Sequence, residues 1–214
     1  PHVSLRAKEE WKAKYRPILN ETPLPPKNKH PHYSYEREPK TTFAAMVSYM
    51  DHNMGLLLAK LEALGIAENT LVMFASDNGP EEVAAYHGTS GYWRGHYFTA
   101  LEGSLRAPFI IRWPSKLPAG KVTNEMVHIT DLLPTLAMIG GYDVPSDRII
   151  DGVDQSDLFF SKNGRSKREG FPVYNGDDLF AYKWRNWKVH FIELNSMFNS
   201  PKRLNVPSVY NLIK

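Results

Sequence analysis

The sequence predicts an α/β fold, and three observations lead to that prediction. Apolar residues recur at helical spacing from about residue 42 to 64, which indicates an amphipathic helix. A uniformly apolar run at residues 71–75 then has the length and composition of a strand covered on both faces. A second such run, Pro-Phe-Ile-Ile-Arg-Trp at residues 108–113, indicates another core strand. Helix and buried strands in this order are typical of an α/β sheet domain.

Residues 3–41 are expected to connect other elements. A charged helical patch occupies residues 7–16, and the density of proline after it excludes a long regular element. Histidines and tyrosines gather in this region, and they could line a substrate entrance. Ordinary loop roles are favoured for them because no metal-ligand spacing joins them; they are His30, His32, Tyr33 and Tyr35.

The helix at residues 42–64 has end signals that match its apolar pattern. Thr41 or Thr42 can cap the start, and Gly65 suits the left-handed position after the end. Its apolar stripe should bury against a sheet, at about 1.5 to 3 kcal/mol for each large side chain. We therefore expect it to be a main source of core stability. The stripe comprises Phe43, Met46, Val47, Met50, Met54, Leu57, Leu58, Leu61 and Leu64.

The strand at residues 71–75 stops at Ser-Asp-Asn-Gly-Pro, residues 76–80, which are residue types that favour turns. Ligands of open α/β sheets bind at the carboxyl ends of the strands. Asp77 offers a carboxylate and Asn78 a carbonyl oxygen, and both are hard ligands that Ca²⁺ or Mg²⁺ prefers. The spacing alone leaves two interpretations open, a metal corner and a plain tight turn.

A loop rich in glycine and aromatic residues follows at residues 81–95, and such loops can be shaped around a ligand. His87 could approach that ligand or simply bond to backbone. Arg94 and Arg106 could each bind an anion through the guanidinium fork. Glu102 is close enough in sequence to pair with either arginine, so a structural Arg–Glu clamp is the favoured interpretation.

Beyond residue 114 the pattern predicts shorter elements. Residues 122–129 could form an edge strand, and a helix should run from Asp131 to residue 139 and end at a Gly-Gly pair. We assign structural roles to His128 and Asp131. The carboxylates of residues 151–154 are spaced like part of a calcium loop, but a turn is preferred because the remaining ligands are lacking.

From about residue 161 the composition changes. Residues 161–170 are basic and contain glycine, which indicates a solvated linker. Three runs of aromatic and β-branched residues then predict an antiparallel sheet, with a hairpin at residues 185–186 between the last two. These runs lie at residues 171–174, 179–184 and 187–193.

The overall composition excludes several classes of protein. Lys and Arg number 26 against 23 acidic residues, and a net charge of +3 without clustering does not indicate nucleic-acid binding. No apolar run approaches the length of a transmembrane helix. The cysteine count of zero rules out disulfides and thiolate chemistry within these residues.

The motifs around the metal corner carry a family resemblance. Ser-Asp-Asn-Gly-Pro-Glu at residues 76–81, followed by GYWRGHYFTALEGSLRAPFIIRWP at residues 91–114, resembles the sulfatase family of the alkaline-phosphatase superfamily. The resemblance spans most of the chain. It implies the C-terminal part of an alkaline-phosphatase-like three-layer α/β sandwich, with a small antiparallel C-terminal sheet.

The resemblance also implies roles for individual residues. Asp77 and Asn78 match the pair that ligates a divalent cation, usually Ca²⁺ and alternatively Mg²⁺, which holds the sulfate ester. Tyr97 stands where the family commonly has a lysine that contacts sulfate. A phenol carries no positive charge near neutral pH, so His96 is the expected substitute at this substrate-binding position. His2 matches a catalytic histidine that acts on the leaving alcohol; a surface histidine is the alternative.

The nucleophile of the family does not occur among these residues. That nucleophile is a formylglycine made from Cys or Ser in a Cys/Ser-x-Pro/Ala-x-Arg motif, and no such motif is present. We expect it, with further acidic ligands, in a missing N-terminal half of the same protein, so that the chain alone should be inactive. Residues 1–160 would belong to the catalytic domain and residues 161–214 to a truncated C-terminal subdomain.

The implied function is hydrolysis of a sulfate ester. A phosphatase or phosphonate monoester hydrolase of the same superfamily is the alternative within catalysis, and a non-catalytic sulfatase-like binding protein is the alternative from another class. Bacterial-type sulfatases are often exported, so the resemblance predicts a periplasmic or extracellular location. The substrate, whether an aryl, sugar or lipid sulfate, is not predicted.

Overall fold

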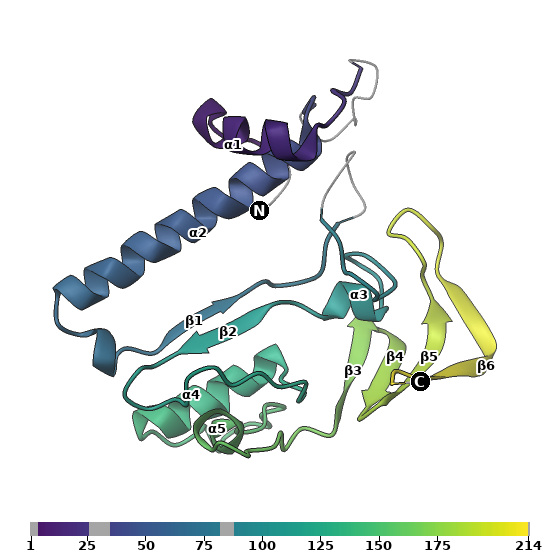
Figure 1. Ribbon diagram of the computed structural model, residues 1–214. Helices are drawn as coiled ribbons and strands as arrows, with labels where there is room; N and C mark the ends of the chain where they lie inside the picture. Colours follow the sequence, from purple (N-terminus) through teal and green to yellow (C-terminus); the bar gives the residue numbers. More distant parts are fainter. Residues whose placement is uncertain (1–3, 26–34, 82–87, 214) are drawn as a thin grey trace. The chain divides into compact units, whose positions relative to one another are not determined.

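The computed structural model describes residues 4–25, 35–81 and 88–213 (Figure 1). The chain divides into two compact units. Unit 1 comprises residues 1–110 together with 195–199, and unit 2 comprises residues 111–194 together with 200–214. The boundary that the sequence predicts at residue 160 stays a prediction.

Unit 1 contains two long helices and the strand that leads into the turn at residues 76–80. In chain order its elements are α1 (Glu9–Leu19), α2 (Pro39–Ala63), the 3-10 turn η1 (Ala67–Asn69), β1 (Val72–Ala75) and α3 (Glu102–Leu105). Strand β2 (Phe109–Arg112) begins in this unit and forms a two-stranded sheet with β1.

Unit 2 contains a short helical region followed by the C-terminal sheet. Its helical elements are η2 (Ile129–Asp131), α4 (Leu132–Gly140) and α5 (Ser156–Phe160). The sheet has the order β3-β4-β5-β6 and is antiparallel throughout, with β3 (Gly170–Asn175), β4 (Asp178–Trp184), β5 (Trp187–Glu193) and β6 (Lys202–Asn211). The small antiparallel sheet is therefore confirmed.

Helix α2 confirms the predicted helix but differs from the prediction at its start and in its burial. It begins at Pro39, so Thr41 and Thr42 are buried inside its first turns and do not cap it. Gly65 has the expected left-handed backbone, with φ 68°. None of the nine side chains of the apolar stripe is fully buried: six are half-buried, and Val47, Leu57 and Leu64 are 37%, 48% and 56% exposed. The predicted burial of this stripe against a sheet is wrong within the described residues, where α2 contacts α1 and η1.

Strand β1 is also less buried than its sequence predicts. Val72, Met73 and Phe74 are half-buried and Ala75 is exposed. A strand covered on both faces needs layers above and below it, and the described residues supply one paired strand, β2. The prediction of a fully covered central strand is therefore wrong for the described part of the chain.

The edge strand predicted at residues 122–129 does not form. Side chains of the following linker bind this segment in place of a strand ladder: the Ser166 hydroxyl donates to the Met126 carbonyl at 2.5 Å, and Arg165 donates to the Glu125 carboxylate at 2.8 Å. Helix α4 follows as predicted, displaced by one residue, and Gly141 ends it in the left-handed region.

The sequence predicted a solvated linker at residues 161–170. This prediction is wrong for Arg168, which is buried in unit 2 and paired with Asp131. Its side chain is 8% exposed and Asp131 is fully buried. The Arg168 Nε and Nη2 atoms donate to Asp131 Oδ1 at 2.9 and 2.5 Å, and Nη2 also donates to the Asp151 carbonyl at 2.7 Å. Burial alone would raise the pKa of Asp131, but Arg168 and two backbone N–H groups hold that pKa below its usual value. The structural role predicted for Asp131 thus has a clear physical basis.

Candidate functional site

The candidate metal corner follows β1 directly. The Ser76 N–H donates to the Pro108 carbonyl at 3.2 Å. This bond extends the pairing of the two strands by one residue, because Ser76 follows β1 and Pro108 precedes β2. The exposed Asp77 side chain accepts from the Asn78 N–H through Oδ1 at 3.0 Å. The Asn78 amide donates through Nδ2 to the Gly79 carbonyl at 2.8 Å, which leaves its Oδ1 as the atom suited to a cation.

Three glycines allow three backbone segments to meet behind this corner. A Cβ on Gly79 would lie 1.8 Å from the Gly103 carbonyl oxygen, and a Cβ on Gly103 would lie 2.3 Å from the Gly95 carbonyl oxygen. Gly95 has φ 100°, a conformation that other residues rarely adopt. Hydrogen bonds fix the approach, from Gly79 N to Ser104 O and from Gly103 N to Arg94 O, both at 2.8 Å. No larger residue fits at these positions without moving the corner.

The segment that carries His96 and Tyr97 is tied to the corner through its backbone. The Tyr97 N–H donates to the Pro80 carbonyl at 2.7 Å. Thr99 donates to the His96 carbonyl through Oγ1 at 2.8 Å, which closes a tight turn. Phe98 in that turn has φ 71°, a strained value for a residue with a side chain. The structure therefore brings the predicted metal and substrate-binding segments together; their roles stay predictions.

The predicted Arg–Glu clamp is confirmed for Arg106. Its Nε donates to Glu102 Oε2 at 2.7 Å, and its guanidinium lies 3.7 Å from the centre of the Trp93 ring. Glu102 is 6% exposed, so the pair is partly desolvated and braces the loop against α3. Arg94 is held differently: Nη2 donates to Asn195 Oδ1 at 2.7 Å.

The donor set of the corner fits a hard divalent cation in part. Asp77 and Asn78 supply oxygen donors, and four residues beyond Asp77 the Glu81 carboxylate has a buried Oε2 without a hydrogen-bond partner in the described structure. A buried carboxylate oxygen in that condition favours a nearby cation. Across the described ranges no three His, Cys, Asp or Glu side chains converge on one point, so other ligands would have to complete the site.

Several residues singled out from the sequence lie outside the described residues. They are His2, the predicted catalytic histidine, and His30, His32, Tyr33 and His87. Among the carboxylates of residues 151–154, that of Asp154 accepts from the Ser156 N–H at 2.9 Å just before α5, and within the described ranges these carboxylates join no group of three possible metal ligands.

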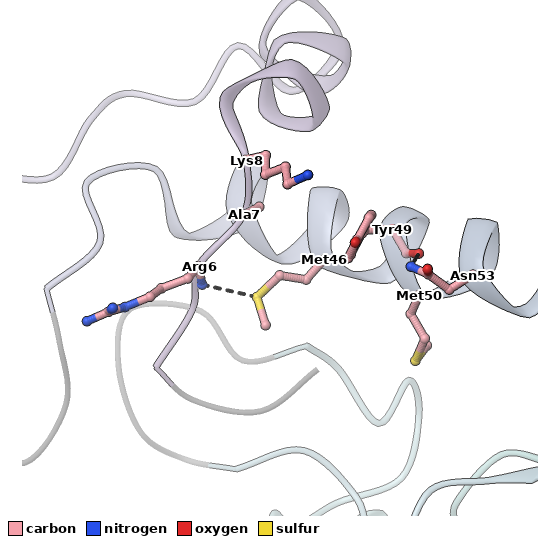
Figure 2. Close-up of a pocket in the computed structure, with 7 residues that line it drawn as sticks. All are labelled: Arg6, Ala7, Lys8, Met46, Tyr49, Met50 and Asn53. Carbon is pink, nitrogen blue, oxygen red and sulfur yellow. Dashed lines mark hydrogen bonds between the residues drawn. The ribbon is translucent and has the colours of Figure 1, made fainter.

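A separate cavity of about 600 Å³ lies between residues 6–8 and α2 (Figure 2). Met46, Tyr49 and Met50 form its apolar side, and the Arg6 N–H donates to the Met46 sulfur at 3.3 Å. None of the predicted site residues lines it. Sequence reasoning missed this cavity, because its two sides come from segments about forty residues apart, as the separation of Arg6 and Met46 shows.

Solved structures of known hydrolases share this fold. The sulfatase PsFucS1 from Pseudoalteromonas sp. superposes with a TM-score of 0.72 and 32% identity, covering 82% of this chain and 36% of that one. The phosphonate monoester hydrolase of Agrobacterium radiobacter gives a TM-score of 0.55 at 20% identity, over 99% of this chain and 44% of that one, and this similarity concerns the fold alone. The fold is therefore that of the alkaline-phosphatase-like hydrolases, as predicted.

Sequence comparison identifies the family. The family model described as Sulfatase matches residues 1–142. Mouse steryl-sulfatase is 36% identical over 159 residues, which cover 70% of this chain and 26% of that protein. Dog N-acetylgalactosamine-6-sulfatase is 36% identical over 147 residues, covering 68% of this chain and 28% of that protein. The chain belongs to the sulfatase family, and it spans about a quarter of the length of these relatives.

No described helix combines the length and the apolar character needed to cross a bilayer.

Proposed function

We propose that the chain is part of a sulfatase that hydrolyses sulfate esters, and that the corner after β1 forms part of its cation site. The observation that carries the proposal is the junction of the Asp77-Asn78 turn with the His96-Tyr97 segment through the hydrogen bond from Tyr97 N to Pro80 O, at 2.7 Å. Membership of the sulfatase family supports the reaction class.

In this proposal, Asp77 and Asn78 hold a divalent cation, Ca²⁺ or Mg²⁺, through their side-chain oxygens. The bound cation supplies Lewis-acid stabilisation of negative charge on the ester oxygens. His96 and Tyr97 contact the sulfate group; Tyr97 donates a neutral hydrogen bond where the family commonly places a lysine. His2 gives a proton to the oxygen of the leaving alcohol as the S–O bond breaks.

The nucleophile belongs to a segment outside these residues. Sulfatases use a formylglycine, and the absence of cysteine and of the corresponding serine motif excludes that residue from this sequence. We propose that a longer protein, called the full-length protein below, joins these residues to the segment that carries the formylglycine and the other cation ligands. The 214 residues alone should then be inactive. By family resemblance, we also propose a periplasmic or extracellular location.

The reaction class is tested by parallel hydrolysis assays of the full-length protein on an aryl sulfate and an aryl phosphate. The proposal expects a clear preference for the sulfate ester. A phosphomonoesterase of the same fold would show the opposite preference, and that result would overturn the sulfatase assignment. An Asp77→Ala variant should lose most activity with either ester because both need the cation.

A non-catalytic binding protein is the second candidate, and the tyrosine at position 97 favours it. Loss of the lysine removes a positive charge from the expected sulfate site. This candidate predicts binding of sulfate esters without turnover, even when the formylglycine is present. Mass spectrometry of the formylglycine peptide, combined with the hydrolysis assay, separates it from the enzyme.

A further inference from the structure

The corner lacks an evident positive charge at position 97, and the structure offers one nearby. Arg94 and Gly79 both contact Gly103: the Arg94 carbonyl accepts from Gly103 N at 2.8 Å, and the Gly103 carbonyl oxygen would lie 1.8 Å from a Cβ on Gly79. Gly103 therefore lies between the backbone of Arg94 and the corner and contacts both. The Arg94 side chain is exposed.

The two arginines of this loop are held by different kinds of group. Arg106 is paired with the Glu102 carboxylate and stacked on Trp93, so its charge is compensated. The hydrogen-bond acceptor of Arg94 is Asn195 Oδ1, a neutral amide, and none of the described carboxylates forms an ion pair with it. An amide can orient a guanidinium without cancelling its charge, which leaves the remaining N–H donors for an anion.

The orienting residue comes from a distant part of the sequence. Residues 195–199 separate β5 from β6 along the chain, yet they belong to the same compact unit as the corner and Arg94. The contact joins residues 101 positions apart. This hydrogen bond between two exposed side chains orients the Arg94 guanidinium.

We propose that Arg94, oriented by Asn195, binds an oxyanion of the substrate and supplies the positive charge that Tyr97 does not carry. The inference rests on the proposed function. The oxyanion is either the sulfate that is hydrolysed or a second anionic group on the leaving alcohol. Both present the planar or tetrahedral oxygens that a guanidinium binds with paired hydrogen bonds. Arg94 is then a binding residue and Asn195 a positioning residue.

The test measures binding to the full-length protein by calorimetry, with inorganic sulfate and with a disulfated disaccharide as probes. Arg94→Gln should weaken binding of at least one probe by about tenfold or more, because a charge-assisted hydrogen bond is lost. A loss with both probes assigns Arg94 to the sulfate that is hydrolysed. A loss confined to the disulfated probe assigns it to the second anion. Unchanged affinity for both probes overturns the proposal.

A second variant separates binding from a purely structural role. Asn195→Asp keeps the size of the side chain and replaces the amide by a carboxylate that neutralises Arg94. A structural role predicts that this variant is at least as stable as the parent and binds normally. The proposal predicts equal stability but an affinity lowered as in Arg94→Gln, and normal binding by a folded Asn195→Asp protein overturns the role of Asn195.

Arg148→Gln is the matched control, because Arg148 is exposed, lies in unit 2 and pairs with its neighbour Asp147. It removes the same charge from the protein, so a general electrostatic effect would lower binding equally in both variants and would overturn a local role for Arg94. Hydrolysis by the parent protein distinguishes failure of the proposed function from failure of the inference about Arg94. If it fails to hydrolyse any sulfate ester, the proposed function fails; if it hydrolyses the ester and Arg94→Gln binds normally, the inference about Arg94 alone fails.

Discussion

Gly103→Ala is the perturbation that tests most sharply how the corner is built. The added Cβ would meet the Gly95 carbonyl oxygen at 2.3 Å, the Trp93 carbonyl oxygen at 2.7 Å and Ser90 Oγ at 2.8 Å. Ordinary contacts of this kind begin near 3.4 Å, so the segments must separate by about 1 Å. Two of the three atoms belong to backbone, which cannot rotate away as a flexible side chain can.

The expected cost follows from that overlap. Overpacking of a closed site costs about 1 to 3 kcal/mol. Stretching the Gly103 N to Arg94 O bond adds about 0.5 to 1.5 kcal/mol. We therefore expect the free energy of unfolding of the full-length protein to fall by roughly 2 to 4 kcal/mol. Ca²⁺ binding should also weaken, because Gly79 of the corner packs on the carbonyl of Gly103.

Urea unfolding and Ca²⁺ titration are the assays, with Gly55→Ala as the control. Gly55 lies inside α2 with nothing within 4 Å of an added Cβ, so the same substitution there should stabilise the protein by about 0.5 to 1 kcal/mol. The two substitutions should thus have opposite signs. A Gly103→Ala protein with parental stability and parental Ca²⁺ affinity would refute the close approach of the three segments.

Three further predictions concern the Asp131–Arg168 ion pair of unit 2, the pH dependence of stability that His128 causes, and the contact of Tyr97 with the substrate. Asp131→Asn should lower the free energy of unfolding by about 3 to 5 kcal/mol, since it leaves Arg168 buried without its charge partner; a loss below 1 kcal/mol in urea unfolding would contradict this. Burial and the charge of Arg168 lower the pKa of His128, whose Nδ1 accepts from Thr130 N at 3.4 Å. Because the folded pKa lies below the unfolded value, the contribution of His128 is present above a pH of about 6.5 and is lost as pH falls. His128→Gln should therefore flatten stability between pH 7.5 and 5.5, and an unchanged slope would count against it. Tyr97→Lys should tighten inorganic sulfate binding by restoring a cation; weaker binding, measured by calorimetry, would show that Tyr97 does not face the anion.

The sequence predicted local elements better than burial. Periodicity located α2 and the three predicted strands of the C-terminal sheet, because these patterns depend on neighbouring residues. The apolar patterns did not predict how far the side chains of α2 and β1 are buried, because burial depends on segments that are distant in the sequence. They also missed β6, whose polar, proline-containing sequence lacks strand alternation and which pairs with β5 through tertiary context.

The candidate site shows the same division. Turn chemistry and family motifs located Asp77, Asn78 and the segment of His96 and Tyr97, and the structure joins them. The partner of Arg94 could not be predicted, because Asn195 is 101 residues away and carries no motif. Arg168 was predicted to be a solvated linker residue. A basic run has the same sequence pattern whether or not one of its residues pairs with a buried carboxylate, as Arg168 does with Asp131.

Calcium titration of the full-length protein, with the parent compared to Asp77→Ala in the same buffer, tests whether the corner after β1 binds a cation. We expect stoichiometric Ca²⁺ binding by the parent and a loss of affinity of at least tenfold in the variant, since a charged ligand is removed from the corner after β1. Equal Ca²⁺ affinity of the two proteins would contradict the assignment of this corner as a cation site.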